Sequence, residues 1–90
     1  MAGPVYAVPA GAGRFDSAAQ VLKQGEAAVA GGAGAVDLVA VAECDSSLLA
    51  CVLAWRRVAQ ARGVSLAVHN PPPNLARIAR LYGVEDLALN

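Results

Sequence analysis

Short apolar runs of strand length alternate with longer helical patterns along this chain, and this alternation restricts the folds open to it. Strands are predicted over residues 4–9, 35–41 and 64–69, and helices over 17–30, 47–62 and 75–82. Strand followed by helix, repeated in this way, predicts an α/β sandwich in which right-handed crossovers place helices against a largely parallel sheet. No internal repeat or interdomain linker interrupts the pattern, so residues 1–90 are expected to form one domain.

The sequence predicts a central and an edge position for two of the strands. Residues 35–41 form a nearly continuous apolar run that is broken only by Asp37, which is typical of a central strand covered on both faces. The first run is flanked by Pro4 and Pro9, and prolines favour an edge position because they cannot donate to a sheet ladder.

Gly25 interrupts the first helix and is predicted to weaken it by up to ~1 kcal/mol relative to Ala.

Polar capping residues precede each predicted helix. Asp16 and Ser17 precede the first, Asp45-Ser46-Ser47 the second, and Asn74 the third, where side-chain oxygens can accept hydrogen bonds from the first backbone amides. Gly83 followed by the apolar Val84 is the pattern of a Schellman ending. The helix boundaries are therefore predicted from cap to cap.

Composition narrows the class of protein. Hydrophobic residues make up 57% of the chain and charged residues only 16%, which argues against intrinsic disorder. The net charge is zero, whereas non-specific nucleic-acid binding needs a basic surplus. No stretch of ~20 apolar residues could span a bilayer, and the first residues lack a signal-peptide pattern, so a cytoplasmic protein without direct membrane insertion is expected. A surface this poor in charge favours cover by a partner.

The residues that carry chemistry are few. His69 is the only histidine, and Cys44 and Cys51 lack the spacing of a metal site or a redox pair. The glycine clusters at 11–13 and 31–34 do not complete a phosphate-binding loop. We therefore expect no catalytic residue, no metal site and no cofactor, because neither a nucleophile–base pair nor a ligand set can be assembled.

The second helix carries apolar residues around most of its circumference. Leu48, Val52, Trp55 and Ala59 make one stripe, while Leu49, Leu53 and Arg56 lie off it. The pattern predicts that a second side of this helix is also buried, and that another molecule supplies the cover. Trp55 fits either the core or an interface anchor. The hydroxyls of residues 46–47 fit capping alone, or capping together with recognition of a partner's acceptor.

Four segments of the chain resemble the STAS domain family. They are Val36-Asp37-Leu38, Asp45-Ser46-Ser47-Leu48-Leu49, the run from Ala61 to Leu66, and the run from Leu75 to Val84. The likeness extends over about Ala35 to Leu89 and is closest to the MlaB-like branch, the small cytoplasmic subunits of the bacterial ABC system that moves phospholipids between the outer and inner membranes.

The resemblance implies a domain with no catalytic centre that binds an ATPase subunit and supports its assembly or activity. Ser46 matches the hydroxyl residue directly after the aspartate, and Ser47 matches the serine that is phosphorylated in the anti-sigma-factor antagonist branch. Two departures stand out. Leu48 occupies a position where both branches usually have glycine, and only one predicted strand precedes the first helix where the family usually has a hairpin.

Two functional hypotheses follow from the residues and the resemblance together. The first is an interaction subunit that docks onto an ABC-transporter ATPase, and through it onto a membrane permease, at the cytoplasmic face of the inner membrane. Its expected contact residues are Asp45, Ser46, Ser47, Leu49, Leu53, Arg56 and Arg57. Five arginines and no acidic residue lie between Cys51 and Arg80, so this half could meet an acidic partner surface. The alternative is a phosphoswitch regulated by phosphorylation of Ser47.

Overall fold

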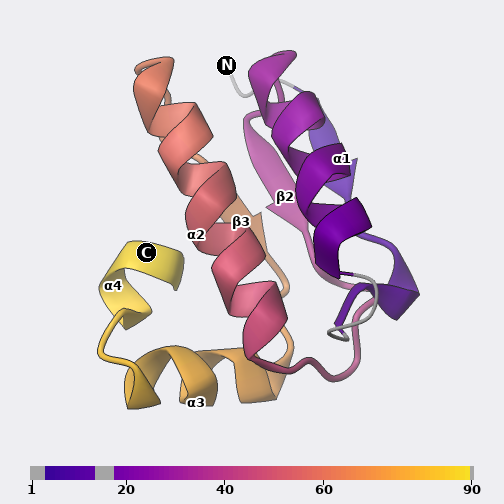
Figure 1. Cartoon of the computed structure of the whole chain (residues 1–90), viewed down its shortest axis with the longest axis vertical. Helices are drawn as coiled ribbons and strands as arrows, with labels where there is room; N and C mark the ends of the chain where they lie inside the picture. Colours follow the sequence, from indigo (N-terminus) through magenta and orange to yellow (C-terminus); the bar gives the residue numbers. More distant parts are fainter. Residues whose placement is uncertain (1–3, 14–17, 90) are drawn as a thin grey trace.

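The computed structural model describes residues 4–13 and 18–89 (Figure 1). The elements are β1 (Val5–Ala7), the 3-10 helix η1 (Ala10–Gly13), α1 (Ala18–Ala30), β2 (Ala35–Asp37), α2 (Ser46–Ala61), β3 (Ala67–His69), α3 (Pro73–Leu81) and α4 (Glu85–Leu89). The predicted order of strands and helices is confirmed, and α4 is an additional helix. The predicted cap at Asp16 and Ser17 lies outside the described residues.

The sheet contains three parallel strands in the order β1-β2-β3. Tyr6 pairs with Val36, and Val36 pairs with Val68. The central place of β2 and the edge place of β1 therefore agree with the sequence. Because α1 connects β1 to β2 and α2 connects β2 to β3, each parallel pair is joined through a helix, as parallel pairing requires.

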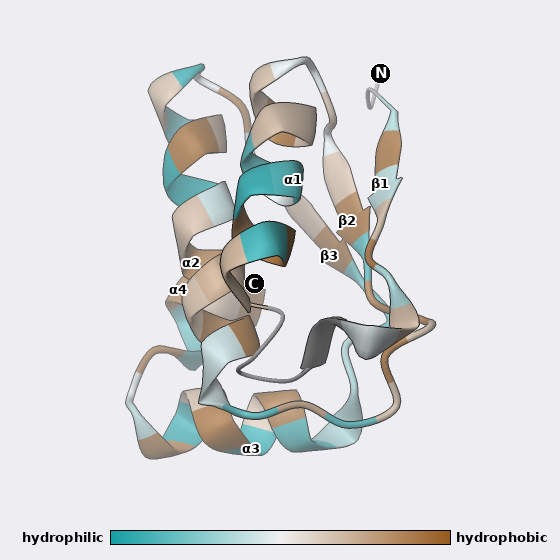
Figure 2. Cartoon of the chain, turned by 45° about the vertical axis from the view of Figure 1, so that its right-hand side comes forward, coloured by the Kyte–Doolittle hydropathy of each residue, from teal (hydrophilic) through white to brown (hydrophobic). Residues whose placement is uncertain are grey.

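Ala35 and Val36 of the central strand point to opposite faces of the sheet and are both buried, as predicted, but helices cover only one of these faces. Figures 1 and 2 show α1 and α2 together on one side of the sheet. Crossovers of the same hand place both helices on one face when the strands follow each other in sequence order. Tyr6 and Val36 point toward the helices, whereas Val5 and Ala67 point away from them and are exposed.

The central strand is also shorter than predicted. The chain turns after Asp37, whose carboxylate Oδ1 accepts a hydrogen bond from the backbone amide of Val39 at 3.0 Å. The amide of Val41 then donates to the carbonyl of Leu38 at 2.9 Å, which closes a tight turn. The amide of Leu38 still donates to the carbonyl of His69 at 2.9 Å, and the apolar run then continues into the core through Leu38 and Val41.

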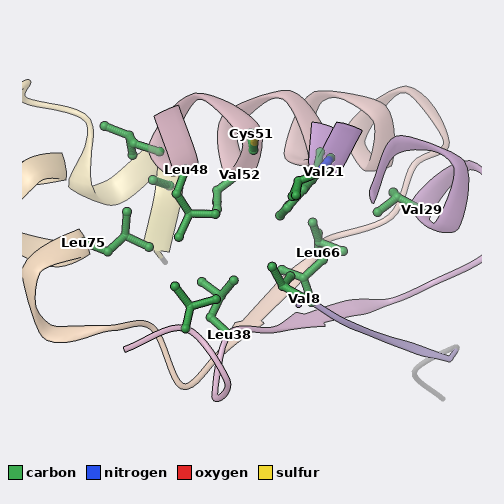
Figure 3. Close-up of a cluster of buried hydrophobic side chains, with 14 of the residues drawn as sticks. Val8, Val21, Val29, Leu38, Leu48, Cys51, Val52, Leu66 and Leu75 are labelled. Carbon is green, nitrogen blue, oxygen red and sulfur yellow. The ribbon is translucent and has the colours of Figure 1, made fainter. Parts of the chain in front are cut away.

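The core lies between the sheet and α2. Figure 3 shows Val8, Leu38 and Leu66 pointing from the sheet side toward Leu48 and Val52 of α2. The predicted stripe along α2 is confirmed, because each of its four residues is fully buried.

The inference that another molecule must cover the second side of α2 is wrong. The helix packs against α1 on one flank and against α3 and α4 on the other, so the chain covers several of its sides by itself (Figure 1). Figure 2 shows that α4 returns to the side of α2 after α3 has crossed below it. The apolar circumference of α2 thus reflects a central position among the helices.

Trp55 belongs to the core and its packing depends on Gly25. The indole Nε1 donates to the carbonyl of Leu22 at 3.1 Å. The Tyr6 ring packs edge to face on the indole, with the two ring centroids 6.0 Å apart. A Cβ atom at Gly25 would overlap the indole ring. Gly25 therefore permits the close approach of α1 and α2, which the sequence did not indicate.

The predicted C-terminal end of α3 is confirmed, and its predicted N-terminal cap is wrong. Gly83 has a φ of +70°, and the amides of Gly83 and Val84 donate to the carbonyls of Arg80 and Ala79, which completes the Schellman motif. Asn74 does not cap α3, which begins at Pro73. Its side chain bonds the backbone of Cys44 in both directions, with Nδ2 to the carbonyl at 2.5 Å and the Cys44 amide to Oδ1 at 3.3 Å.

Candidate functional site

One face of α2 is covered by no other element in the described part of the chain, and it carries a row of four residues. Ser46, Ala50, Leu53 and Arg57 are separated by four, three and four positions, which places them on one side of the helix. Ser46, Ala50 and Arg57 are exposed and Leu53 is half-buried. We call this row the α2 ridge.

A groove lies on each side of the start of the α2 ridge. The α1 groove has a volume of about 460 Å³ and is lined by Ala18, Ala19, Leu22, Asp45, Ser46, Ser47, Ala50 and Cys51. The tail groove has a volume of about 450 Å³ and is lined by Ser46, Leu49, Ala50, Leu53, Tyr82 and Val84. Ser46 and Ala50 border both grooves, so the ridge separates two hollows that a partner could enter.

The cap of α2 fixes the polar end of the ridge. Asp45 has extended backbone angles, and its Oδ1 accepts from the amide of Ser47 at 2.9 Å. The hydroxyl of Ser47 donates to the same oxygen. The predicted cap is therefore confirmed with Asp45 as the capping residue, and the exposed Ser46 presents the second hydroxyl at the positive end of the helix.

The structure brings together only part of the predicted contact set. Ser46, Leu53 and Arg57 lie on the α2 ridge, with Asp45 at its start. Ser47 is half-buried and borders the α1 groove.

Leu49 and Arg56 differ from the expectation. Only 4% of the Leu49 surface is exposed, so this residue forms the floor of the tail groove as a member of the core. Arg56 borders a different hollow, next to Asp86 and Leu87 of α4. Partial burial lowers the pKa of the Arg56 guanidinium, although arginine stays charged at neutral pH. A partner on the α2 ridge would therefore meet Arg57 and leave Arg56 to the side.

The exposed arginines differ in whether the chain already pairs them. Arg80 makes an ion pair with Glu85 at 3.4 Å. Arg57 and Arg77 are exposed, and neither makes an ion pair within residues 4–13 and 18–89. These two guanidinium groups remain available to a partner's acidic side chains.

Neither thiol has the properties of a nucleophile. Burial and the nearby Asp45 raise the pKa of the Cys44 thiol to about 11, and burial likewise raises the pKa of Cys51. Both groups therefore stay protonated at neutral pH. Among the described residues, no three His, Cys, Asp or Glu side chains lie close enough together to hold a metal ion.

The sequence did not predict two features of the site. Tyr82 and Val84 form one wall of the tail groove, although 64% of the Tyr82 surface remains exposed. Tyr82 lies within the helix predicted over residues 75–82, but α3 ends at Leu81 and Tyr82 follows it as the C-terminal cap. The Asn74–Cys44 pair ties the segment before α2 to α3 across 30 positions, and no local pattern indicates such a contact.

Comparison with known proteins gives one match. Residues 10–89 match the family model described as "Mlab, STAS domain". The match takes in every helix from α1 to α4 together with β2 and β3, and it begins after β1. No curated protein and no solved structure matches the chain. None of the helices in the described part of the chain is long and apolar enough to cross a membrane.

Proposed function

Because this chain belongs to the MlaB-type STAS domain family, we propose that it is an interaction subunit that binds and supports the ATPase of a bacterial phospholipid-transport ABC complex of the Mla type. STAS domains are generally non-catalytic. The family match over residues 10–89 is the observation that carries this proposal. The chain would then act at the cytoplasmic face of the inner membrane, where the ATPase links it to the permease.

The α2 ridge supports docking as the mechanism. Binding would bury Leu53 and Ala50, and would place the exposed hydroxyl of Ser46 beside polar groups of the ATPase. Interfaces of this kind combine an apolar centre with a polar rim. Here Ser46 and Arg57 lie at the two ends of the apolar centre.

The phosphoswitch at Ser47 has less support. The Ser47 hydroxyl is already bonded to the capping carboxylate of Asp45. A phosphate at Ser47 would place about −1.5 to −2 charge beside that carboxylate. Leu48, which stands where the family usually has glycine, is fully buried and fixes the backbone next to Ser47. We therefore favour docking without phosphorylation.

Affinity purification from the native bacterium tests the proposal. The tagged chain is recovered under mild conditions, and its partners are identified by mass spectrometry. We expect an ABC ATPase together with its permease. Recovery of a serine kinase with phosphate on Ser47 would support the alternative, and recovery of neither would contradict both.

A matched pair of variants connects the partner to the α2 ridge. Leu53→Arg places a charge in the middle of the ridge, whereas Val39→Arg makes the same kind of change at a residue that is 69% exposed after β2. We expect Leu53→Arg to lose the ATPase and Val39→Arg to retain it, with both variants folded by circular dichroism. Leu49→Arg is unsuitable because it would place a charge in the core.

A further inference from the structure

The tail groove is lined mainly by apolar side chains, and only Ser46 and Tyr82 among its lining residues carry a hydroxyl group. Beside it, the end of α3 exposes two large apolar side chains, Leu81 at 80% and Tyr82 at 64%. Large hydrophobic residues gathered on one part of a small domain mark an interaction surface more often than chance.

The shape of the surface favours a helix as the occupant. From Ser46 to Arg57 the α2 ridge spans 12 residues, a rise of roughly 16 Å or about three helical turns. Ala50 lies between Ser46 and Leu53, where a small side chain lets a second helix approach closely. A β-strand is disfavoured, because the sheet lies on the other side of the helices and offers no edge here (Figure 1).

The charges near the α2 ridge favour a partner helix that carries acidic side chains. Arg57 stands one turn after Leu53 on the same face, and it has no ion-pair partner within the described residues. No acidic residue occurs between Cys51 and Arg80. At the opposite end, the Asp45 carboxylate is engaged by Ser47 in the cap. An acidic side chain on the partner would therefore be attracted to the Arg57 end of the ridge.

We infer that the α2 ridge and the tail groove together bind an amphipathic helix of the partner, with its apolar face against Leu53 and Tyr82 and an acidic flank beside Arg57. The inference rests on the docking function proposed above and specifies the segment that docks. In such helix-in-groove binding, the partner's apolar residues recur at positions i, i+3 or i+4, and i+7.

Synthetic peptides test the inference without the ATPase. Two peptides of about 15 residues, roughly four turns, share one leucine stripe and differ in carrying Glu or Lys on the flanks. A third contains a central proline that breaks the helix. Each is titrated into the full chain, and the amide shifts are followed by two-dimensional NMR.

We expect the Glu peptide to shift the amides of Ala50, Leu53 and Tyr82, the Lys peptide to bind at least about fivefold more weakly, and the proline peptide not to bind. Arg57→Glu should abolish the preference for Glu over Lys. Arg77→Glu, the same charge change at an exposed arginine of α3 that makes no ion pair within residues 4–13 and 18–89, should preserve it.

Equal affinity for the Glu and Lys peptides, shifts confined to the open face of the sheet, or no binding would overturn the inference. So would an equal effect of Arg57→Glu and Arg77→Glu. The outcomes remain separate from those of the proposed function. Groove binding without recovery of an ATPase would contradict only the function, and recovery of an ATPase without groove binding would contradict only the helical segment.

Discussion

Gly25 and Trp55 show how one missing side chain can decide the spacing of two helices. The indole ring occupies the space that a Cβ atom at Gly25 would need, while its Nε1 reaches the Leu22 carbonyl one turn away. Helix propensity alone ranks this glycine as a defect. The three-dimensional contact explains why a poor helix former stands at a buried position of α1.

Gly25→Ala should lower the free energy of unfolding by roughly 1–3 kcal/mol, because overpacking outweighs the gain of up to ~1 kcal/mol in helix propensity. Gly11→Ala is the control, since a Cβ built there meets no atom within 4 Å among the described residues, apart from those of its chain neighbours. Chemical denaturation measures both variants. A Gly25→Ala variant more stable than wild type would contradict the packing described for Trp55.

Asp37 joins the ends of β2 and β3 through its carboxylate. Hydrogen bonds from the Asn70 side chain at 3.1 Å and from the Val39 amide at 3.0 Å lower the pKa of Asp37, with the Asn70 bond the larger cause. Since the pKa is lower in the folded chain than in the unfolded chain, the carboxylate contributes stability above its ordinary range. That contribution is lost as the pH falls through the folded pKa.

Asp37→Asn should therefore flatten the loss of stability on acidification below about pH 4, the usual range for aspartate. The measurement is the difference in free energy of unfolding between wild type and variant across an acid pH series. The two curves should converge toward low pH. A constant difference at every pH would show that the charge of Asp37 does not contribute to the pH dependence of stability.

At the scale of single residues, local patterns predicted what local contacts determine. The Asp45 cap and the Schellman ending at Gly83 were predictable because their partners lie within a few positions. Asn74 was misassigned to a cap because its partner, Cys44, is 30 positions away. The role of Gly25 likewise depends on Trp55, which belongs to another helix.

Among the elements, α2 is the one whose surroundings differ most from those expected from the sequence. Its apolar circumference was taken to require a partner, but α1, α3 and α4 cover its flanks. The error arose because α4 was not recognised as a helix. Five residues are too few to establish a helical period, although Glu85 and Asp86 suit the first turn of one.

Asp45→Ala should lower the free energy of unfolding by about 1 kcal/mol, because the amide of Ser47 loses its acceptor at the start of α2. Asp45→Asn should keep most of the stability, since the amide oxygen can still cap. Ser46→Ala, at an exposed neighbour, is the control and should change little. Thermal unfolding followed by circular dichroism measures all three, and equal midpoints for Asp45→Ala and Ser46→Ala would contradict the cap.

Two neighbouring substitutions test whether α4 is part of the fold. Ala88 is fully buried, so Ala88→Asp should lower the free energy of unfolding by at least about 2 kcal/mol through burial of a charge. Leu87 is largely exposed, and Leu87→Asp should stay within about 0.5 kcal/mol of wild type. Urea denaturation separates the two. Similar midpoints would mean that α4 does not pack on α2.

For the whole molecule, the order of elements and the parallel sheet were predictable, and the distribution of layers was not. The apolar run at 35–41 indicated a central strand correctly, but one face of β2 is left without a helix (Figure 2). Hydrophobicity of a strand does not state on which side the crossovers lie. That choice follows from the strand order, which the sequence did not give directly.

Charge behaves in the same way at this scale. Seven basic and seven acidic residues balance over the chain, yet the stretch from Cys51 to Arg80 contains five arginines and no acidic residue. Arg57 places part of that excess at the end of the α2 ridge. The balance of the whole sequence therefore hides the polarity of the surface on which the proposed docking depends.

The central claim is that the α2 ridge binds an ABC ATPase, and the dissociation constant of the chain from the purified ATPase tests it most directly. We expect Leu53→Arg to raise this constant at least about tenfold, the effect of losing one central contact residue. Val39→Arg, at the exposed residue after β2, should leave it unchanged. Equal dissociation constants for wild type and a folded Leu53→Arg variant would contradict the claim.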